Sequence, residues 1–67
     1  MPYPERIRAL REDHDLTQKQ VAVLLGIAQN TYSQYETGKL AIPIEQLLFL
    51  CQYYHVSSDY ILGLTKK

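Results

Sequence analysis

The chain has 67 residues, of which 46% are hydrophobic and seven each are basic and acidic, the composition of a small globular domain with no net charge. This hydrophobic fraction excludes an intrinsically disordered chain, and no apolar run approaches the roughly 20 residues that a membrane-spanning helix needs. We therefore expect a single domain over 1–67, with a folded part at about 4–63 and a flexible tail at 64–67, near the smallest size for which one hydrophobic core is sufficient.

The first predicted element is a helix within Tyr3 to His14. Pro4 can occupy the first turn of a helix without loss of a hydrogen bond, and Ile7 and Leu10 then repeat at helical spacing. The triplet Asp13-His14-Asp15 ends this helix, and aspartate is among the few residue types that tolerate a left-handed backbone. We interpret the triplet as a solvated turn. The alternatives are a carboxylate–histidine acid/base pair or a metal ligand, but no nucleophile or complete ligand set stands within reach.

A second helix is predicted from about Gln18 to Leu25. Thr17, followed three residues later by Gln20, forms a capping box, in which each side chain satisfies a backbone N–H at the start of a helix. Gly26 ends the helix because glycine tolerates the left-handed conformation, and Ile27 beyond it can fold back onto the apolar side. That apolar side is formed by Val21, Leu24 and Leu25, with Ala22 leaving room for a neighbouring helix.

A third helix follows at about Gln29 to Glu36, so that two short helices are joined by a tight turn. Tyr32 and Tyr35, three residues apart, face inward, and Gly38 closes the helix. Amide and hydroxyl side chains both donate and accept hydrogen bonds, whereas Lys and Glu would be expected on a side that serves solubility alone. The outward side of this helix has such uncharged polar residues at Gln29, Asn30, Thr31, Ser33 and Gln34.

Two further helices complete the predicted fold. A loop ends at Pro43, which leads into a fourth helix at about Ile44 to Tyr54 with proline in its first turn. Ser57 caps a short fifth helix, Ser58 to Leu62, whose inward side chains are Tyr60 or Ile61, together with Leu62. The fourth helix closes the core with an apolar stripe of Leu47, Leu50, Cys51 and Tyr54.

Cys51 and the two histidines are the residues that could carry redox or metal chemistry. We interpret Cys51 as a buried core residue, because a reactive thiol, the alternative, needs electropositive and partly open surroundings. One cysteine cannot form an internal disulfide, and the histidines stand at no recognised metal spacing. The N-terminus also lacks the regions of a signal peptide, so the sequence predicts a cytoplasmic protein with no metal and no cofactor.

The pattern resembles the helix-turn-helix of the phage repressor and Cro family, also called Xre-like regulators. The match extends from about Ile7 to Gly63 and rests on Arg11, Leu16-Thr17-Gln18, Ala22, Leu25-Gly26, Tyr35-Glu36, Gly38, Pro43, Leu47, Leu50, Val56-Ser57, Asp59-Tyr60 and Leu62. The resemblance implies an all-α, compact five-helix, lambda-repressor-like DNA-binding domain whose second and third helices form the helix-turn-helix. The chain departs from the family at Asp15, often Gly or Asn, and at Ala28, where the family usually has a Ser or Thr that caps the third helix.

The resemblance also assigns contacts with DNA. An α-helix fits the major groove, where Gln or Asn can bind adenine through two hydrogen bonds. Base contacts are expected from Gln29, Asn30, Ser33 and Gln34. Backbone contacts are expected from Thr17, Gln18, Lys19, Thr37 and Lys39. A neutral total charge can conceal a basic face, which could be supplied by Arg6, Arg8, Lys19 and Lys39. The alternative is that all of these are ordinary solvated side chains.

Two pairs of residues have predicted structural roles. The resemblance implies a partly buried ion pair between Arg11 and Glu36, which joins the first helix to the end of the third. Phe49 and Tyr53 lie beside the inward stripe of the fourth helix, where the family more often has polar or small residues, and should touch each other. We expect this aromatic pair to form part of a two-fold homodimer contact with the fifth helix. The alternative is that the pair covers the preceding loop or packs on the tail.

The sequence therefore predicts a small transcriptional regulator that binds double-stranded DNA sequence-specifically, as a dimer on a palindromic operator, and acts as a repressor. It is not expected to be an enzyme. We expect it in the cytoplasm of a bacterium or phage host, associated with the nucleoid. The alternative is an antitoxin-like or assembly module that retains the fold without specific DNA binding, and the absence of net charge is the best support for it.

Overall fold

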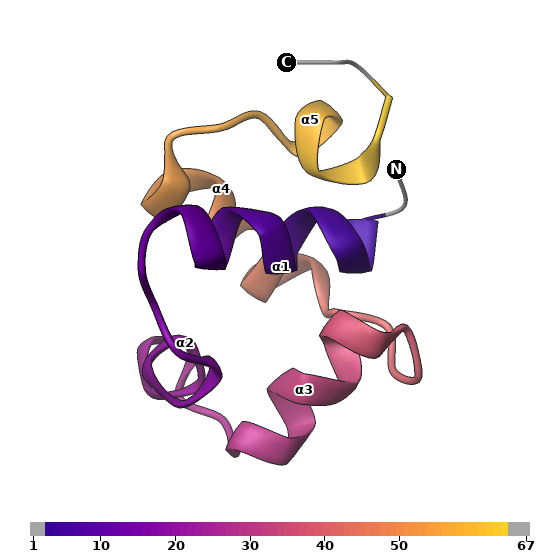
Figure 1. The fold of residues 1–67 in the computed structure, drawn as a ribbon. Coiled ribbons are helices and arrows are strands. Elements are labelled where there is room, and N and C mark those ends of the chain that lie inside the picture. The colour runs from indigo at the N-terminus through magenta and orange to yellow at the C-terminus, as the bar shows by residue number, and fades with distance from the viewer. Residues whose placement is uncertain (1–2, 65–67) are drawn as a thin grey trace.

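The computed structural model describes residues 3–64, which fold into five α-helices with no strand among them (Figure 1). The helices are α1 (Tyr3–Asp13), α2 (Gln18–Leu25), α3 (Gln29–Thr37), α4 (Ile44–Tyr54) and α5 (Ser58–Leu62). The predicted all-α fold is confirmed, and α2, α4 and α5 have the predicted bounds, while α3 extends one residue beyond Glu36. Most of the predicted tail, 65–67, lies outside the described residues. Leu64 is described, and it donates its N–H to the carbonyl of Asp59 at 2.9 Å.

The helices are arranged around α1, which crosses the middle of the molecule (Figure 1). α2 and α3 lie on one side of α1 and α5 lies on the other, while α4 passes behind it. α1 packs against α3 and α5, α2 packs against α3, and α4 packs against α5. This arrangement places the α2–α3 pair at the end of the molecule opposite α5, where no other described helix covers its outer side.

One hydrophobic core receives side chains from all the helices. Tyr32 and Tyr35 of α3 are buried and meet edge to face, with their ring centroids 6.3 Å apart, so their predicted inward orientation is confirmed. Burial of a large apolar side chain stabilises the fold by about 1.5–3 kcal/mol relative to exposure. The core therefore holds α3 firmly against α1 and α2. Its other buried members are Ile7, Leu10, Val21, Ala22, Leu47, Leu50, Cys51, Tyr54 and Ile61.

Hydrogen bonds define both ends of α2, the first helix of the α2–α3 pair. At the start, Thr17 Oγ1 accepts from the N–H of Gln20 at 3.1 Å and Gln20 Oε1 accepts from the N–H of Thr17 at 2.8 Å, which confirms the capping box. At the end, Gly26 adopts the left-handed conformation with a φ of 72°. Ile27 then donates its N–H to the carbonyl of Ala22 at 3.0 Å. The bonds of Gly26 and Ile27 thus end α2 and begin the turn that leads into α3.

Two leucines that were predicted to face inward are exposed. The buried side of α2 is centred between Val21 and Ala22. Because each step along a helix turns the side chain by about 100°, Leu24 lies at the edge of that side. Leu62 is exposed because Ile61, which is fully buried, and Tyr60, which is partly buried, are the residues of α5 that pack against the core. In both helices the spacing alone was compatible with inward orientation, and the neighbouring helices decided the outcome.

The connecting segments contain three further residues that the sequence had singled out. Asp15 has a φ of 56°, the left-handed conformation that its residue type allows. Ala28 precedes α3 and makes no side-chain cap hydrogen bond, as expected for alanine. Pro43 precedes α4 with a ψ of 148°, so the prediction that it occupies the first turn of that helix is wrong. Its fixed φ suits both positions, and the extended ψ places it just outside the helix.

Candidate nucleic-acid interface

A polar hollow lies on the outer side of the α2–α3 pair. It has a volume of about 550 Å³ and is lined by Gln18, Gln29, Asn30, Ser33 and Gln34. The structure thus brings together the four residues predicted to contact bases, with Gln18 from the start of α2 beside them. All five side chains are uncharged, and all can donate and accept hydrogen bonds. The hollow can therefore bind a ligand whose polar edge presents both hydrogen-bond donors and hydrogen-bond acceptors.

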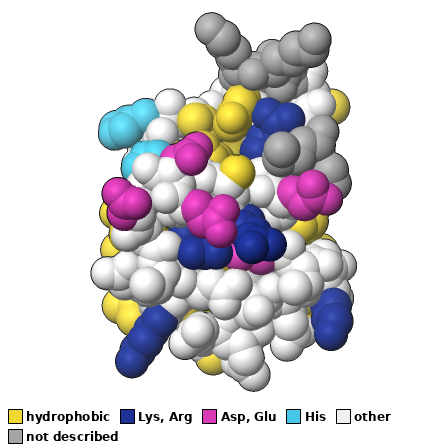
Figure 2. Space-filling view, in the orientation of Figure 1, with side chains coloured by type: hydrophobic (Ala, Val, Ile, Leu, Met, Phe, Trp, Pro, Cys, Tyr) yellow, Lys and Arg dark blue, Asp and Glu magenta, His cyan; other side chains and the backbone are white. Residues whose placement is uncertain are grey.

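Charge is distributed around this polar surface rather than on it. Figure 2 shows the end of the molecule that carries α2 and α3 as largely uncharged, with a basic side chain at each lower edge and the acidic side chains higher up, at the level of α1. Lys19, in the first turn of α2, and Lys39, in the loop after α3, are both exposed. These two lysines stand at the start of the α2–α3 pair and just beyond its end, where their positive charge can attract a polyanion.

The two arginines that were candidates for a basic face have other partners on α1. The guanidinium carbon of Arg6 lies 4.5 Å from the centre of the Tyr60 ring, on the side of α1 that faces α5. Arg8 Nε donates to Glu12 Oε2 at 3.3 Å, in an exposed ion pair one helical turn apart. Neither arginine lines the hollow, and the part of the predicted basic face that they would supply stays a prediction. A helical spacing places residues on a face but does not identify which neighbouring helix that face meets.

An ion pair behind the hollow joins α1 to α3. Arg11 Nε donates to Glu36 Oε2 at 2.7 Å, and Arg11 Nη2 donates to Glu36 Oε1 at 3.2 Å. The side chain of Arg11 is 12% exposed and that of Glu36 is 2% exposed. A third bond, from Arg11 Nη1 to the carbonyl of Leu16 at 2.8 Å, attaches the segment before α2 to the same arginine. The pair implied by the resemblance thus lies where α1, α2 and α3 meet.

Glu36 remains ionised in this buried position. Burial opposes the charged carboxylate, but the hydrogen bonds from Arg11, together with the bond from Gln18, outweigh it and hold the pKa of Glu36 below its ordinary value. The same hydrogen bond to Glu36 is the main reason that the pKa of Arg11 is raised. Both groups are therefore charged throughout the neutral range, and the pair has the short, charge-assisted bonds that position two helices accurately.

Gln18 has a role that the sequence did not predict. Its Nε2 donates to Glu36 Oε1 at 3.0 Å, so this side chain connects the buried ion pair to the hollow. Gln18 was expected to contact a DNA phosphate, and with Nε2 engaged it keeps its amide oxygen and its second N–H for a ligand. No local pattern could have identified this bond, because its partners lie 18 residues apart in the sequence.

The residues predicted to contact the DNA backbone lie at two places on this surface. Thr17, Gln18 and Lys19 lie at the start of α2, and Thr37 and Lys39 lie at the end of α3 and just beyond it. The hydroxyl of Thr17 accepts a bond within its own helix and keeps its proton for another acceptor. The hydroxyl of Thr37 instead donates its proton to the carbonyl of Gln34 at 3.3 Å. Thr17 can therefore bind a phosphate oxygen without losing a bond, whereas Thr37 would have to exchange one.

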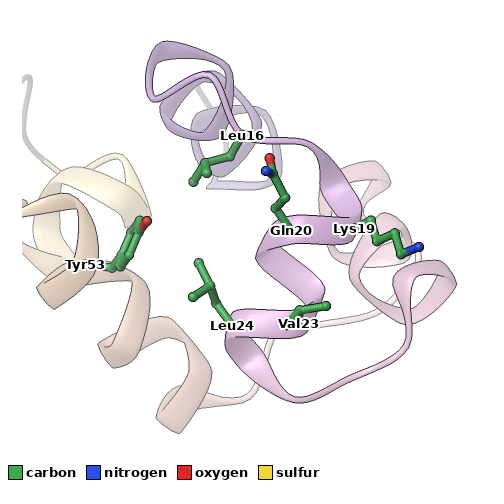
Figure 3. A pocket seen from close by; sticks show the side chains of 6 residues that line it. All are labelled: Leu16, Lys19, Gln20, Val23, Leu24 and Tyr53. Atoms are coloured by element: carbon green, nitrogen blue, oxygen red, sulfur yellow. The ribbon is translucent and has the colours of Figure 1, made fainter.

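Phe49 and Tyr53 lie on α4. Their rings are stacked, with centroids 6.1 Å apart and planes 14° from parallel, which confirms that they touch. They are 37% and 40% exposed. Tyr53 also faces Leu24 of α2 across a groove between the two helices (Figure 3). This groove has a volume of about 400 Å³, and its lining residues are Leu16, Lys19, Gln20, Val23, Leu24 and Tyr53. The sequence did not predict it, since it depends on how α2 and α4 are placed.

The residues considered for catalysis or metal binding are either exposed in a turn or packed against their neighbours. The triplet at 13–15 is exposed, and His14 lies with Nδ1 2.8 Å from the carbonyl oxygen of Leu10 and its ring 4.7 Å from that of Tyr54. Cys51 is buried in the core, as predicted, and burial raises the pKa of its thiol. Within 3–64, no three His, Cys, Asp or Glu side chains gather as a metal site requires. None of the helices in that range combines the length and apolarity needed to cross a membrane.

Two short helices joined by a glycine turn, with a polar second helix exposed on its outer side, define a helix-turn-helix domain. The HTH_3 helix-turn-helix family model matches residues 7–61, and the chain belongs to this Xre/Cro/C1-like family. The resemblance inferred from the sequence is therefore confirmed.

Proteins with similar sequences include a transcriptional regulator and an antitoxin. The chain is 46% identical over 63 residues to the uncharacterized HTH-type transcriptional regulator YobD of Bacillus subtilis (strain 168), covering 94% of this chain and 56% of that protein. It is 39% identical over 59 residues to the antitoxin PezA of Streptococcus pneumoniae serotype 4, covering 88% of this chain and 37% of PezA. The chain thus spans about half or less of the length of these curated relatives.

Solved structures share the fold. A transcriptional regulator from Listeria innocua superposes with a TM-score of 0.88 at 31% identity, over 97% of this chain and 61% of that one. The P22 c2 repressor, whose crystal structure is a complex with a synthetic operator, superposes with a TM-score of 0.82 at 31% identity, over 92% of this chain and 94% of the repressor chain. The five-helix, repressor-like architecture predicted from the sequence is confirmed by these similarities.

Proposed function

We propose that this chain is the DNA-binding domain, 1–67, of a transcriptional repressor that binds double-stranded DNA in a sequence-specific manner, with α3 in the major groove. The observation that carries the proposal is the hollow of five uncharged amide and hydroxyl side chains on the outer side of the α2–α3 pair. The similarity to the P22 c2 repressor, which was crystallised with an operator, supports it. Repression then follows from occupation of the operator alone. We place the protein in the bacterial cytoplasm, in association with the nucleoid.

Base recognition is assigned to Gln29, Asn30, Ser33 and Gln34. The major groove is about 12 Å wide and admits an α-helix, and the amide of Gln or Asn can donate to N7 of adenine and accept from its N6 amino group. Ser33 can act as either partner. The ion pair behind the hollow supports this assignment, because it fixes the position of α3 relative to α1, and the bond from Gln18 to Glu36 connects α2 to the same pair.

Contacts with phosphate are assigned to Thr17, Gln18, Lys19, Thr37 and Lys39. The first three stand at the N-terminus of α2, where exposed N–H groups and the helix dipole attract anions. The two lysines supply the charge that neutralises phosphates and releases counterions. Such contacts position the domain on the duplex without reading its sequence.

A homodimer that binds a palindromic operator is part of the proposal. Two-fold binding requires recognition helices about 34–36 Å apart so that they enter successive major grooves. A single domain measures 29 × 22 × 20 Å, so two copies are needed to span that distance. The exposed stack of Phe49 and Tyr53 is the contact that we assign to the dimer, together with α5, because clustered exposed aromatics on a small domain are typical of an interface.

The experiment that tests the proposed function is selection of bound sites from a random DNA pool, followed by mobility shifts on the selected site at about 50 and 200 mM salt. A two-fold site bound at least a thousandfold more tightly than random DNA would support it. Gln29→Ala is the informative variant, and Gln52→Ala is its matched control, since Gln52 is an exposed glutamine on α4. Enrichment of no sequence would contradict the proposal.

The second candidate is an interaction module that does not bind specific DNA. Similarity to the antitoxin PezA and the absence of net charge favour it. The same selection separates the two candidates, because an interaction module leaves the pool unchanged at both salt concentrations.

A further inference from the structure

Ala28 occupies the position that caps α3 but supplies no cap. Among the other helix caps, Thr17 Oγ1 accepts from the backbone at the start of α2 and Ser57 Oγ accepts at the start of α5. Pro43 before α4, which has no side-chain acceptor, makes no such bond. Ala28 has the same extended backbone, with φ −73° and ψ 149°, and its side chain makes no such bond. Helix stability therefore favours a hydroxyl here, and does not account for the methyl group that is present.

The methyl group of Ala28 points outward beside the polar hollow. Ala28 is exposed, whereas the preceding residue, Ile27, is partly buried against the core. The residue that follows Ala28, Gln29, lines the hollow. Figure 1 shows the start of α3 at the end of the molecule opposite α5. An apolar group thus stands at the tip of the surface that we assign to the major groove.

The chemistry of this surface matches one kind of base pair. In the major groove the bidentate partner of Gln or Asn is adenine, and the apolar partner of an alanine methyl is the C5-methyl group of thymine. Guanine is bound most often by Arg or Lys, and cytosine by Glu or Asp. From Gln29 to Gln34, the residues of α3 carry no charge of either sign. The face therefore presents partners for adenine and thymine and lacks the charged partners of guanine and cytosine.

We propose that α3 recognises A·T base pairs, with Ala28 as the thymine-methyl contact beside the adenine contacts of Gln29 and Gln34. This inference rests on the proposed function and deepens it, because it names the class of operator and adds a specificity-determining residue. The absent cap is then a property of the recognition surface, in which a stabilising hydroxyl is replaced by a methyl group that binds DNA.

The test uses the whole 67-residue chain and a site selected from random DNA. Each thymine of one half-site is replaced in turn by uracil, which removes the C5-methyl group alone. At one position the wild-type protein should lose affinity about fourfold, the value of one buried methyl group. Ala28→Gly should show the same loss on the thymine site and no further loss on the uracil site. If Ala28→Gly and uracil replacement weakened binding independently of each other at every position, the methyl group of Ala28 would not contact a thymine methyl group.

A second variant separates recognition from folding. Ala28→Ser supplies the missing cap, so its melting temperature should rise while its affinity for the selected site falls. If Ala28 had a structural role alone, the affinity would be unchanged, because the wild-type domain is already folded. Ala28→Ser binding as tightly as wild type, or more tightly, would overturn the inference.

The outcomes also distinguish this inference from the function on which it rests. A specific site in which Gln29→Ala relaxes the choice at an A·T pair supports the inference. A specific site whose discriminated positions are G·C pairs, or one that uracil replacement nowhere weakens, overturns the inference and leaves DNA binding intact. Selection that enriches no sequence overturns both.

Discussion

Replacement of Arg11 by methionine should destabilise the domain severely. The substitution removes both hydrogen bonds that Glu36 receives from Arg11 and leaves a carboxylate that is 2% exposed with the single bond from Gln18. Breaking a buried pair in this way costs about 3–5 kcal/mol. At about 0.05–0.15 kcal/mol per residue, a domain of 67 residues has a free energy of unfolding of roughly 3–10 kcal/mol. The loss is therefore comparable to the whole stability.

Thermal unfolding followed by helical circular dichroism measures this effect. A change of 1 kcal/mol shifts the melting temperature of a domain of this size by about 4–8 °C, so Arg11→Met should lower it by roughly 12–40 °C. Arg8→Met is the matched control, because Arg8 lies on the same helix and its pair with Glu12 is 63% and 55% exposed. That exposed pair contributes at most about 0.5 kcal/mol.

Arg11→Lys keeps the charge and loses the parallel two-bond geometry, so its melting temperature should fall between those of wild type and Arg11→Met. This variant keeps the comparison measurable if Arg11→Met is unfolded at every temperature. Equal melting temperatures for Arg11→Met and Arg8→Met would refute the reasoning, because the buried pair would then contribute no more than the exposed one.

Three further predictions concern pH, DNA and assembly. Because the folded-state pKa of Glu36 lies below its unfolded value of about 4.5, the unfolded state binds more protons in acid. The free energy of unfolding should be at its full value above that pH and fall as the pH drops through the folded pKa, and in Glu36→Gln this part of the pH dependence should disappear. Gln29→Ala should weaken binding to the selected site by about 1–3 kcal/mol and relax one base position, whereas Lys39→Ala should weaken binding to cognate and random DNA alike and reduce the salt dependence. Equal losses on both DNAs from Gln29→Ala would show that the helix face is assigned wrongly. Phe49→Glu or Tyr53→Glu should convert the proposed dimer to folded monomers in sedimentation and sharply weaken binding to a palindromic site, and a wild-type monomer at high micromolar concentration would rule out this interface.

The helix bounds could be predicted because their signals are local. A capping box starts α2, and glycines in the left-handed conformation end α2, α3 and α5. Each signal acts within a few residues of the chain, so the sequence contains all the information that determines it. The same holds for the stack of Phe49 on Tyr53, which lie four residues apart on one helix.

The missed features depend on contacts between helices. Gln18 was assigned to phosphate alone, although its amide also bonds to Glu36. Leu24 was assigned to the core, although it lines a groove with Tyr53. Arg6 was a candidate for the basic face, although it lies on the Tyr60 ring. In each case the local pattern placed the residue on a helix, while its partner was determined by how α2 packs against α3, α2 lies beside α4 and α1 packs against α5, which spacing does not encode.

The distribution of charge determines how the proposed DNA contacts would divide between affinity and specificity. Within 3–64 the basic residues without an ion-pair or aromatic partner are Lys19 and Lys39. Each phosphate contact contributes about −0.9 to the slope of log affinity against log salt, so these lysines give a slope of roughly −2 per domain. Random DNA, which offers phosphates but no matched base edges, should therefore be bound weakly. The amides of α3 and the methyl group of Ala28 would then supply most of the discrimination between DNA sequences. A net charge of zero is compatible with selective binding, because a scarcity of positive charge weakens binding to random DNA more than binding to a matched site.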